Sequence, residues 1–103
     1  AIEQVVAING GARSTLWRQI LADVLGVPIR WRPSSEGSAV GAAALAAVGA
    51  GVFKEASEIR GWLEPTIDTL PDIGAHQVYV RQHEVFLKVY RDLKESFKVL
   101  QES

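Results

Sequence analysis

The stretch "AINGGARSTLW", residues 7–17, constrains the fold more than any other part of the chain. It joins an apolar run, residues 5–8, to the start of a helix-like pattern, and two glycines separate them. An apolar run that ends at Asn-Gly-Gly is typical of a strand buried on both faces and closed by a turn. A helix that follows such a strand directly indicates an α/β protein.

The rest of the chain continues the alternation of strand and helix. Apolar residues at helical spacing predict a helix that ends at Gly26, followed by a strand over 29–32. An alanine-rich helix is predicted over 38–50, a short helix over 55–63 and an extended, proline-bounded stretch over 65–71. A long helix with a continuous apolar seam is predicted from about residue 75 to 101. Two strands make a poor sheet alone, so we expect partner strands from elsewhere.

Composition limits the kinds of partner. The 103 residues suffice for one domain, and 11 Lys and Arg against 12 Asp and Glu give no general attraction for nucleic acid or anionic lipid. The sequence has no cysteine, which excludes disulfides and thiolate metal sites, and His76 and His83 alone cannot form a zinc site. The most apolar stretch, residues 39–53, is shorter than the roughly 20 residues of a membrane-spanning helix.

The chain starts at Ala1 and contains no methionine, and no secretory signal is visible in it. We therefore expect a piece of a longer protein, which we call the parent protein.

The glycine turn has two interpretations on the residues alone. Glycine allows a positive φ and close approach of a ligand to the main chain, and the N–H groups of the next helix favour an anion. The pattern "GGARS" satisfies neither the Walker motif nor the dinucleotide motif G-x-G-x-x-G. An ordinary structural turn and a ligand-binding loop both remain open at this point.

Other residues also have a structural and a functional interpretation. Arg13 fits either a solvated side chain or a phosphate ligand. The triplet Arg-Trp-Arg at 30–32 fits an edge strand that buries its tryptophan, because no wider basic patch accompanies it to bind nucleic acid. Glu36 fits a charge at a helix N-terminus, with contact to a nucleotide cleft as the alternative. His83 fits a packed residue of the apolar seam.

Two motifs carry a family resemblance. "INGGARSTLWRQILADVLGVPI", residues 8–29, resembles the nucleotide-side segment of the FGGY carbohydrate kinases, and of their xylulokinase branch in particular. "EGSAVGAAALAAVGAGVF", residues 36–53, is similar to the next motif of that family, a glutamate followed by a Gly-Ala-Ala helix. The helix with Tyr79 and Tyr90 resembles the end of these enzymes. The resemblance therefore spans nearly the whole chain, in order and spacing.

The resemblance implies an α/β fold that forms part of an actin-like (ribonuclease H-like) ATPase domain, in the C-terminal lobe of a sugar kinase and ending in a long helix. Residues 1–103 would be the C-terminal part of the second, nucleotide-side domain. Gly10, Gly11 and Ala12 map onto the loop that meets the nucleotide, and Thr15 maps onto a helix position near adenine. Many members carry asparagine at that last position, so a hydroxyl here replaces an amide.

For the parent protein, the resemblance implies a cytoplasmic, ATP-dependent kinase that transfers the γ-phosphate to a sugar hydroxyl, with xylulose as the expected sugar. The expected partners are ATP, Mg²⁺, a small sugar and the remainder of the kinase chain, and a homo-oligomer is compatible with this. Nucleic acid and membrane are not expected. The catalytic base and the metal ligands are expected outside this chain, so we assign it no catalytic and no metal residue and expect it to be inactive alone.

One alternative belongs to a different class of protein. A stand-alone helical interaction module, without nucleotide binding, would dock through the apolar seam of the last helix, at Phe86, Tyr90, Leu93 and Phe97.

Overall fold

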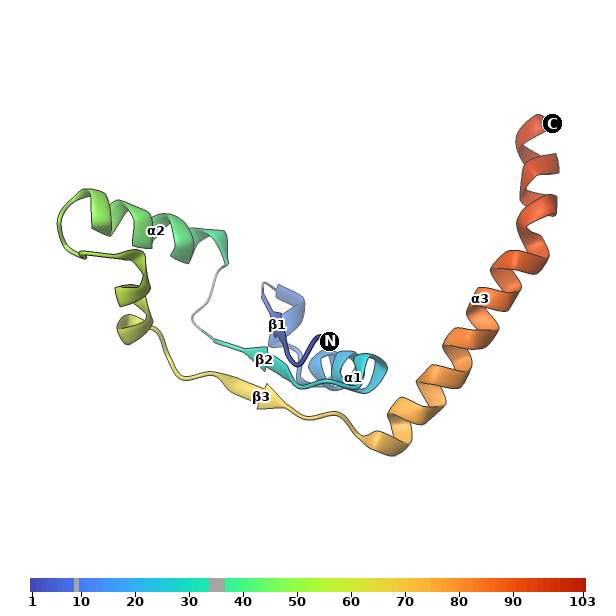
Figure 1. Cartoon of the computed structure of the whole chain (residues 1–103), viewed down its shortest axis with the longest axis horizontal. Helices are drawn as coiled ribbons and strands as arrows, with labels where there is room; N and C mark the ends of the chain where they lie inside the picture. Colours follow the sequence, from blue (N-terminus) through green and yellow to red (C-terminus); the bar gives the residue numbers. More distant parts are fainter. Residues whose placement is uncertain (9, 34–36) are drawn as a thin grey trace.

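The computed structural model describes residues 1–8, 10–33 and 37–103, and contains three strands and three α-helices in these ranges (Figure 1). The strands are β1 (Val5–Ala7), β2 (Ile29–Trp31) and β3 (Ile67–Thr69). The helices are α1 (Thr15–Leu25), α2 (Ser38–Gly49) and α3 (Ile73–Glu102), and two 3₁₀ helices are η1 (Gly10–Arg13) and η2 (Ala56–Trp62). The predicted order of strands and helices is confirmed, and the stretch predicted only as extended contains a third strand.

The three strands form one sheet in the order β1-β2-β3. β1 and β2 are parallel, with Val5 opposite Ile29, and β3 runs antiparallel to β2. The prediction of an edge strand over 29–32 is therefore wrong, because β2 is the central strand of this sheet. β3 is fixed to it by Arg30, which donates two hydrogen bonds of 2.8 Å to the carboxylate of Asp68. These hydrogen bonds lower the pKa of Asp68 below its usual value.

Helix α1 joins the two parallel strands, and both of its ends are capped. Ser14 accepts a hydrogen bond of 3.2 Å from the N–H of Trp17, as an N-cap residue does. At the other end Gly26 has a φ of 68°, and its N–H donates to the carbonyl of Ala22 at 2.8 Å. The predicted end of the helix at this glycine is confirmed, because the left-handed conformation favours a residue without a Cβ.

Asp23 connects α1 to the start of α3. Its carboxylate accepts hydrogen bonds from the side chain of Gln19 at 2.8 Å and from the N–H of Asp72 at 2.7 Å. The carbonyl of Asp23 lies 2.8 Å from Nδ1 of His76, and this nitrogen must be the donor because a carbonyl only accepts. Asp72 in turn caps α3 by accepting from the N–H of Ala75. The direction in which α3 leaves the sheet therefore depends on α1.

Helix α2 packs against η2 in a second, smaller cluster. Ala44 and Phe53 are buried there, and Phe53 meets the ring of Trp62 edge-on, with the ring centroids 5.1 Å apart. The small side chains of α2 leave most of its surface exposed. This cluster thus buries only one of the faces that the alanine-rich sequence offers.

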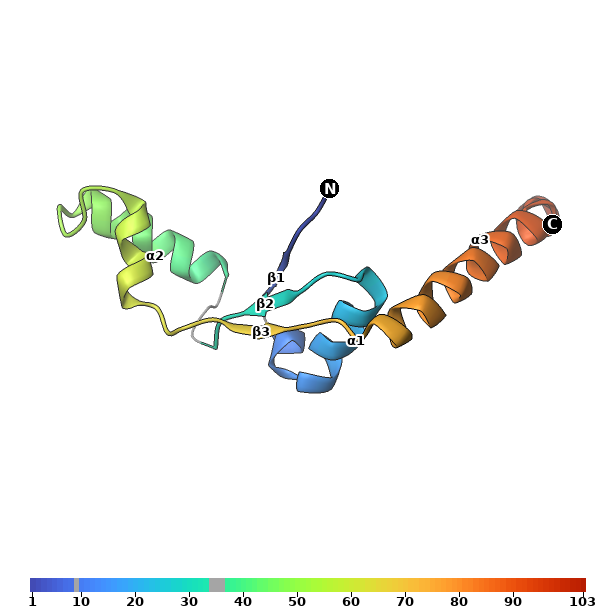
Figure 2. The ribbon, with the colours of Figure 1, turned by 60° about the horizontal axis from the view of Figure 1, so that its bottom comes forward.

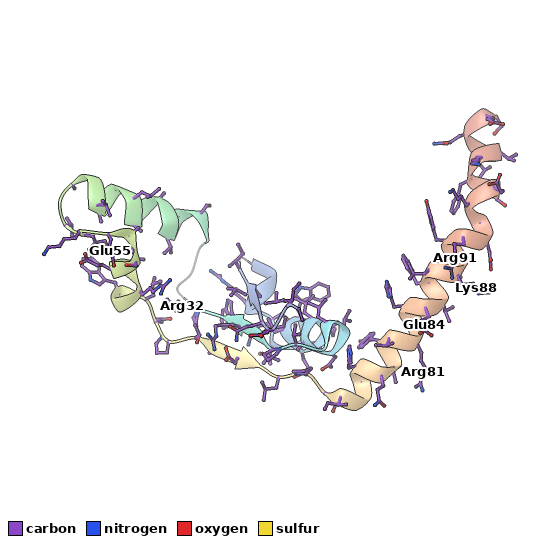
Figure 3. The ribbon with its side chains drawn as sticks, in the orientation of Figure 1. Arg32, Glu55, Arg81, Glu84, Lys88 and Arg91 are labelled. Atoms are coloured by element: carbon purple, nitrogen blue, oxygen red, sulfur yellow. The ribbon has the colours of Figure 1, made fainter. Side chains whose placement is uncertain are left out.

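The chain as a whole is extended. Its radius of gyration is 20.0 Å, whereas a compact domain of this length has about 13 Å. Figures 1 and 2 show α3 projecting away from the sheet, and every residue from 81 to 103 is exposed. The side chains of Arg81, Glu84, Lys88 and Arg91 follow this helix away from the sheet (Figure 3). The long helix is confirmed. Its first turns contact α1, but from residue 81 onward its apolar seam is exposed in the described part of the chain.

The buried apolar residues in the described ranges are few and mostly small, namely Ala12, Ala22, Ile29, Ala44 and Phe53. Large side chains such as Phe86 and Leu100 are about 70% exposed, at 69% and 71%. None of the described helices has the length and hydropathy that a bilayer crossing requires.

We predict that the isolated 103-residue chain self-associates, because the sheet has unpaired edges and α3 exposes apolar side chains. Sedimentation velocity over a range of concentrations measures this. A compact monomer at all concentrations would contradict the expectation.

We predict that Gly26→Ala lowers the unfolding free energy of the parent protein by roughly 2–3 kcal/mol. A Cβ at this position would lie 2.6 Å from Cε1 of His76, so the imidazole must move and lose its bond to Asp23.

Gly51→Ala is the matched control for this variant. Gly51 also has a positive φ, of 76°, but a Cβ there meets nothing within 4 Å. Thermal or urea unfolding should show a smaller loss for Gly51→Ala, of about 1–2 kcal/mol. Equal losses in the two variants would show that the contact with His76 contributes nothing.

Candidate functional site

The predicted site residues lie together at one edge of the sheet. Gly10, Gly11 and Ala12 belong to η1, which follows β1, and Thr15 is the first residue of α1. Since β1 and β2 are parallel, the segment that follows β2 leaves the sheet at the same edge. In open α/β sheets, ligands bind outside the carboxyl ends of the parallel strands. The four residues therefore occupy the edge where such folds place their ligands.

Gly10 and Gly11 do not use the positive φ that glycine allows. Both lie in a right-handed 3₁₀ helix, whereas positive φ angles occur at Gly26, Gly37 and Gly51. A Cβ added to Gly10 would meet no described atom within 4 Å, and one added to Gly11 would only touch Trp17 at 3.5 Å. A Cβ would therefore not obstruct the turn within this chain. Neither backbone strain nor internal packing requires glycine at these two positions.

Ala12 and Thr15 differ in their surroundings. Ala12 is buried, with only 3% of the residue exposed, and its carbonyl accepts a hydrogen bond from Arg18. Thr15 is exposed, and its hydroxyl oxygen lies 3.5 Å from Nη2 of Arg18. A hydroxyl that accepts one bond can still donate its own hydrogen. Arg13 is also exposed, at the end of η1, and Glu36 lies outside the described residues.

Arg18 is the residue that sequence reasoning missed. The helical pattern predicts it on a solvated face, but its side chain is buried, with 5% exposed. Nη1 donates a hydrogen bond of 2.5 Å to the carbonyl of Ala12, and the guanidinium lies 4.3 Å above the ring of Trp31. Arginine stacks on aromatic rings in this way and can donate in several directions at once.

Two features of the sequence could have indicated that Arg18 is buried. Arg18 lies one turn into a helix that begins directly after the glycine turn, on the side that faces back to η1. Trp31 lies between two arginines in the sequence, so one face of β2 carries an aromatic ring. The ring is half-buried, and the guanidinium of Arg18 lies over it.

The described residues form no metal centre, since no cluster of three or more histidines or carboxylates occurs among them. An apolar groove of about 750 Å³ lies between α1 and α3, away from the glycine turn, and is lined by Val24, Leu25, Tyr79, Val80, His83 and Phe86 among others. His83 is therefore part of an open groove and is not packed as the sequence predicts.

Comparison with protein families gives one match. The profile of the FGGY family of carbohydrate kinases, C-terminal domain, matches residues 1–50. These residues contain β1, the glycine turn, α1, β2 and α2.

Two relatives from Escherichia coli strain K12 extend the similarity over most of the chain. Its xylulose kinase is 37% identical over 92 residues, which are 88% of this chain and 19% of that protein. Its autoinducer-2 kinase is 37% identical over 89 residues, which are 85% of this chain and 17% of that protein. The chain thus spans about a fifth of the length of these relatives.

Two solved structures have a similar fold. The ligand-bound xylulose kinase from Lactobacillus acidophilus matches 94% of this chain and 20% of its own, with a TM-score of 0.78 and 21% identity. The xylulose kinase from Rhodospirillum rubrum matches 93% of this chain and 20% of its own, with a TM-score of 0.74 and 33% identity. The extended arrangement of sheet, α2 and α3 therefore also occurs inside much longer chains.

Proposed function

This chain belongs to the FGGY family of carbohydrate kinases, and on that premise we propose that it is the C-terminal part of the nucleotide-side domain of an ATP-dependent sugar kinase. Its fold is part of the actin-like ATPase fold of the xylulose kinases. The domain assignment covers residues 1–103, and the kinase activity is that of the parent protein. The role of this chain is to help bind and orient the nucleotide.

The accessible backbone at Gly10 and Gly11 is the observation that carries the proposal. A Cβ on Gly10 would meet no described atom within 4 Å, and one on Gly11 would only touch Trp17, so a group from outside can approach the backbone of this turn. A nucleotide lying against η1 would be such a group. A Cβ at either position would point into the space that the ligand needs.

The start of α1 gives the same edge a preference for anions. The first N–H groups of a helix have no partner within it, and the helix dipole adds a partial positive charge. The side chain of Ser14 accepts a hydrogen bond from the N–H of Trp17. The next residue, Thr15, is exposed. We infer that backbone N–H groups and the Thr15 hydroxyl contact the nucleotide, together with Gly10, Gly11 and Ala12. Arg13 is close enough in sequence to approach a phosphate.

The residues that carry out phosphoryl transfer are proposed to lie outside this chain. Phosphoryl transfer depends on positioning and on a metal ion that neutralises the charge of the phosphates. We propose that the ligands of Mg²⁺ and the base that accepts the proton of the sugar hydroxyl belong to the rest of the parent protein. We therefore expect a site that is complete only when both lobes are present.

Xylulose is the sugar that we propose. The solved structure with 33% identity is a xylulose kinase, and so is a relative with 37% identity. The autoinducer-2 kinase has the same identity, which makes its substrate the second one to test. The alternative of a stand-alone helical module is less well supported, because the family match contains β1, the glycine turn and β2 rather than α3.

We predict that the parent protein consumes ATP when xylulose is added, and that the isolated 103-residue chain does not. A coupled assay for ADP measures both, with heat-treated protein as the control. Xylulose-dependent ATP consumption by the pure chain would contradict the proposal that the catalytic residues lie outside this chain.

We predict that Gly11→Ala in the parent protein weakens ATP binding at least several-fold and leaves xylulose binding nearly unchanged. The new methyl group fits the chain itself, where it would touch only Trp17, so a loss would report on the ligand. Gly11→Val should lower the affinity for ATP further, because its side chain occupies more of the same space.

Gly61→Ala is the matched control for these variants. Gly61 also lies in a 3₁₀ helix, η2, and a Cβ there meets nothing within 4 Å. Calorimetric titration of each ligand separately, with circular dichroism to check folding, gives the comparison. If folded Gly11→Val binds ATP as wild type does, the turn is structural and the assignment of Gly10, Gly11 and Ala12 is withdrawn.

A further inference from the structure

We propose that Arg18 is a positioning residue, which holds η1 in the conformation that receives the nucleotide. The proposal rests on the proposed function and adds a residue that is not itself among the nucleotide contacts. It predicts that nucleotide affinity depends on a side chain buried beneath the turn.

The contacts of Arg18 join three separate elements. Nη1 donates to the carbonyl of Ala12 in η1 at 2.5 Å, and Nη2 lies 3.5 Å from the hydroxyl oxygen of Thr15 in α1. The plane of the guanidinium lies over Trp31 in β2, 4.3 Å from the ring centroid. The turn, the helix that follows it and the central strand are therefore connected through one side chain. Each of these elements borders the edge where the nucleotide is proposed to bind.

The burial of this charge is costly, which argues that it has a specific role. The side chain is 5% exposed, and Nε has no hydrogen-bond partner in the described part of the chain. The ion pairs Arg30–Asp68, Lys88–Asp92 and Lys98–Glu95 do not include Arg18. A buried charge without a counter-ion is unfavourable unless dipoles or an aromatic face stabilise it. Here the carbonyl of Ala12 and the ring of Trp31 provide that stabilisation.

A positive charge beneath η1 also suits the proposed ligand. Its field adds to the dipole of α1 at the same edge of the sheet, and both favour a polyphosphate. The hydrogen bond to Ala12 fixes the last part of η1, whose backbone is proposed to meet the nucleotide. Arg18 thus acts on the nucleotide through the turn and through its charge, without touching the ligand.

Lysine cannot reproduce this arrangement. Its ammonium group is a compact point charge, whereas a guanidinium presents donors in a planar fork and stacks on a ring. An Arg18→Lys variant keeps the charge but loses one of the two directed donors and the stacking on Trp31. Arg18→Met keeps most of the apolar volume and loses the charge and every donor.

The test measures ATP and xylulose affinity separately in the parent protein by calorimetry. We expect Arg18→Met to weaken ATP binding roughly tenfold, which corresponds to about 1.4 kcal/mol, and to leave xylulose affinity within about twofold. Arg18→Lys should lie between Arg18→Met and wild type. Arg81→Met is the matched control, because Arg81 is an exposed arginine of α3, far from the sheet (Figure 3).

A double-mutant cycle with Trp31→Leu tests the proposed stacking. If Arg18 acts from its place over the ring, the losses of ATP affinity from Arg18→Met and Trp31→Leu are not additive. Additive losses would show that Trp31 does not hold Arg18 for this purpose.

Other outcomes overturn the proposal in distinguishable ways. Unchanged ATP affinity in folded Arg18→Met overturns the role of Arg18 alone, while the proposed function stands. Equal losses of ATP and xylulose affinity with a lower melting temperature show a purely structural residue. If Arg18→Met does not fold, the test uses Arg18→Lys. A loss of ATP affinity without a loss of xylulose affinity in that variant supports the proposal, and unchanged ATP affinity overturns it. A wild-type parent protein that does not bind ATP overturns both proposals.

Discussion

The parallel pairing of β1 with β2 is the constraint on which the rest of the structure depends. Two parallel neighbours cannot be joined by a tight hairpin, so the chain must cross the sheet, and α1 makes that crossing. The N–H of Val5 bonds to the carbonyl of Pro28 at 3.1 Å, which sets the register at the start of both strands. As a consequence, η1 and the start of α1 lie at the carboxyl edge of the sheet, where Arg18 packs beneath the turn.

The sequence predicted the local elements well because each has its own signal. Gly26 ends α1 through a positive φ, and the apolar periodicity of the last segment matches a single helix, Ile73–Glu102. The central place of β2 could not be predicted, because β3 is three residues long and its pairing depends on a contact between Arg30 and Asp68, 38 residues apart. The burial of Arg18 and Asp23 was missed for a related reason, since hydrophobic periodicity places charged residues on the solvated face.

For the candidate site, the sequence located the turn but not its physical basis. Glycine allows either a positive φ or close approach of a ligand, and Gly10 and Gly11 lie in a right-handed 3₁₀ helix without a positive φ. Close approach of a ligand is therefore the reason that we propose for these two glycines. The apolar seam of α3 is exposed in the described part of the chain, which spans about a fifth of the length of the relatives it matches.

Hydrogen–deuterium exchange of the parent protein, with and without a non-hydrolysable ATP analogue, tests the central claim most directly. If the nucleotide lies against the glycine turn, amides in residues 10–18 exchange more slowly when the analogue is present, and those in the C-terminal half of α3, residues 88–102, are unchanged. Protection elsewhere in the parent protein, with no change over residues 10–18, would contradict the assignment of this edge of the sheet to the nucleotide.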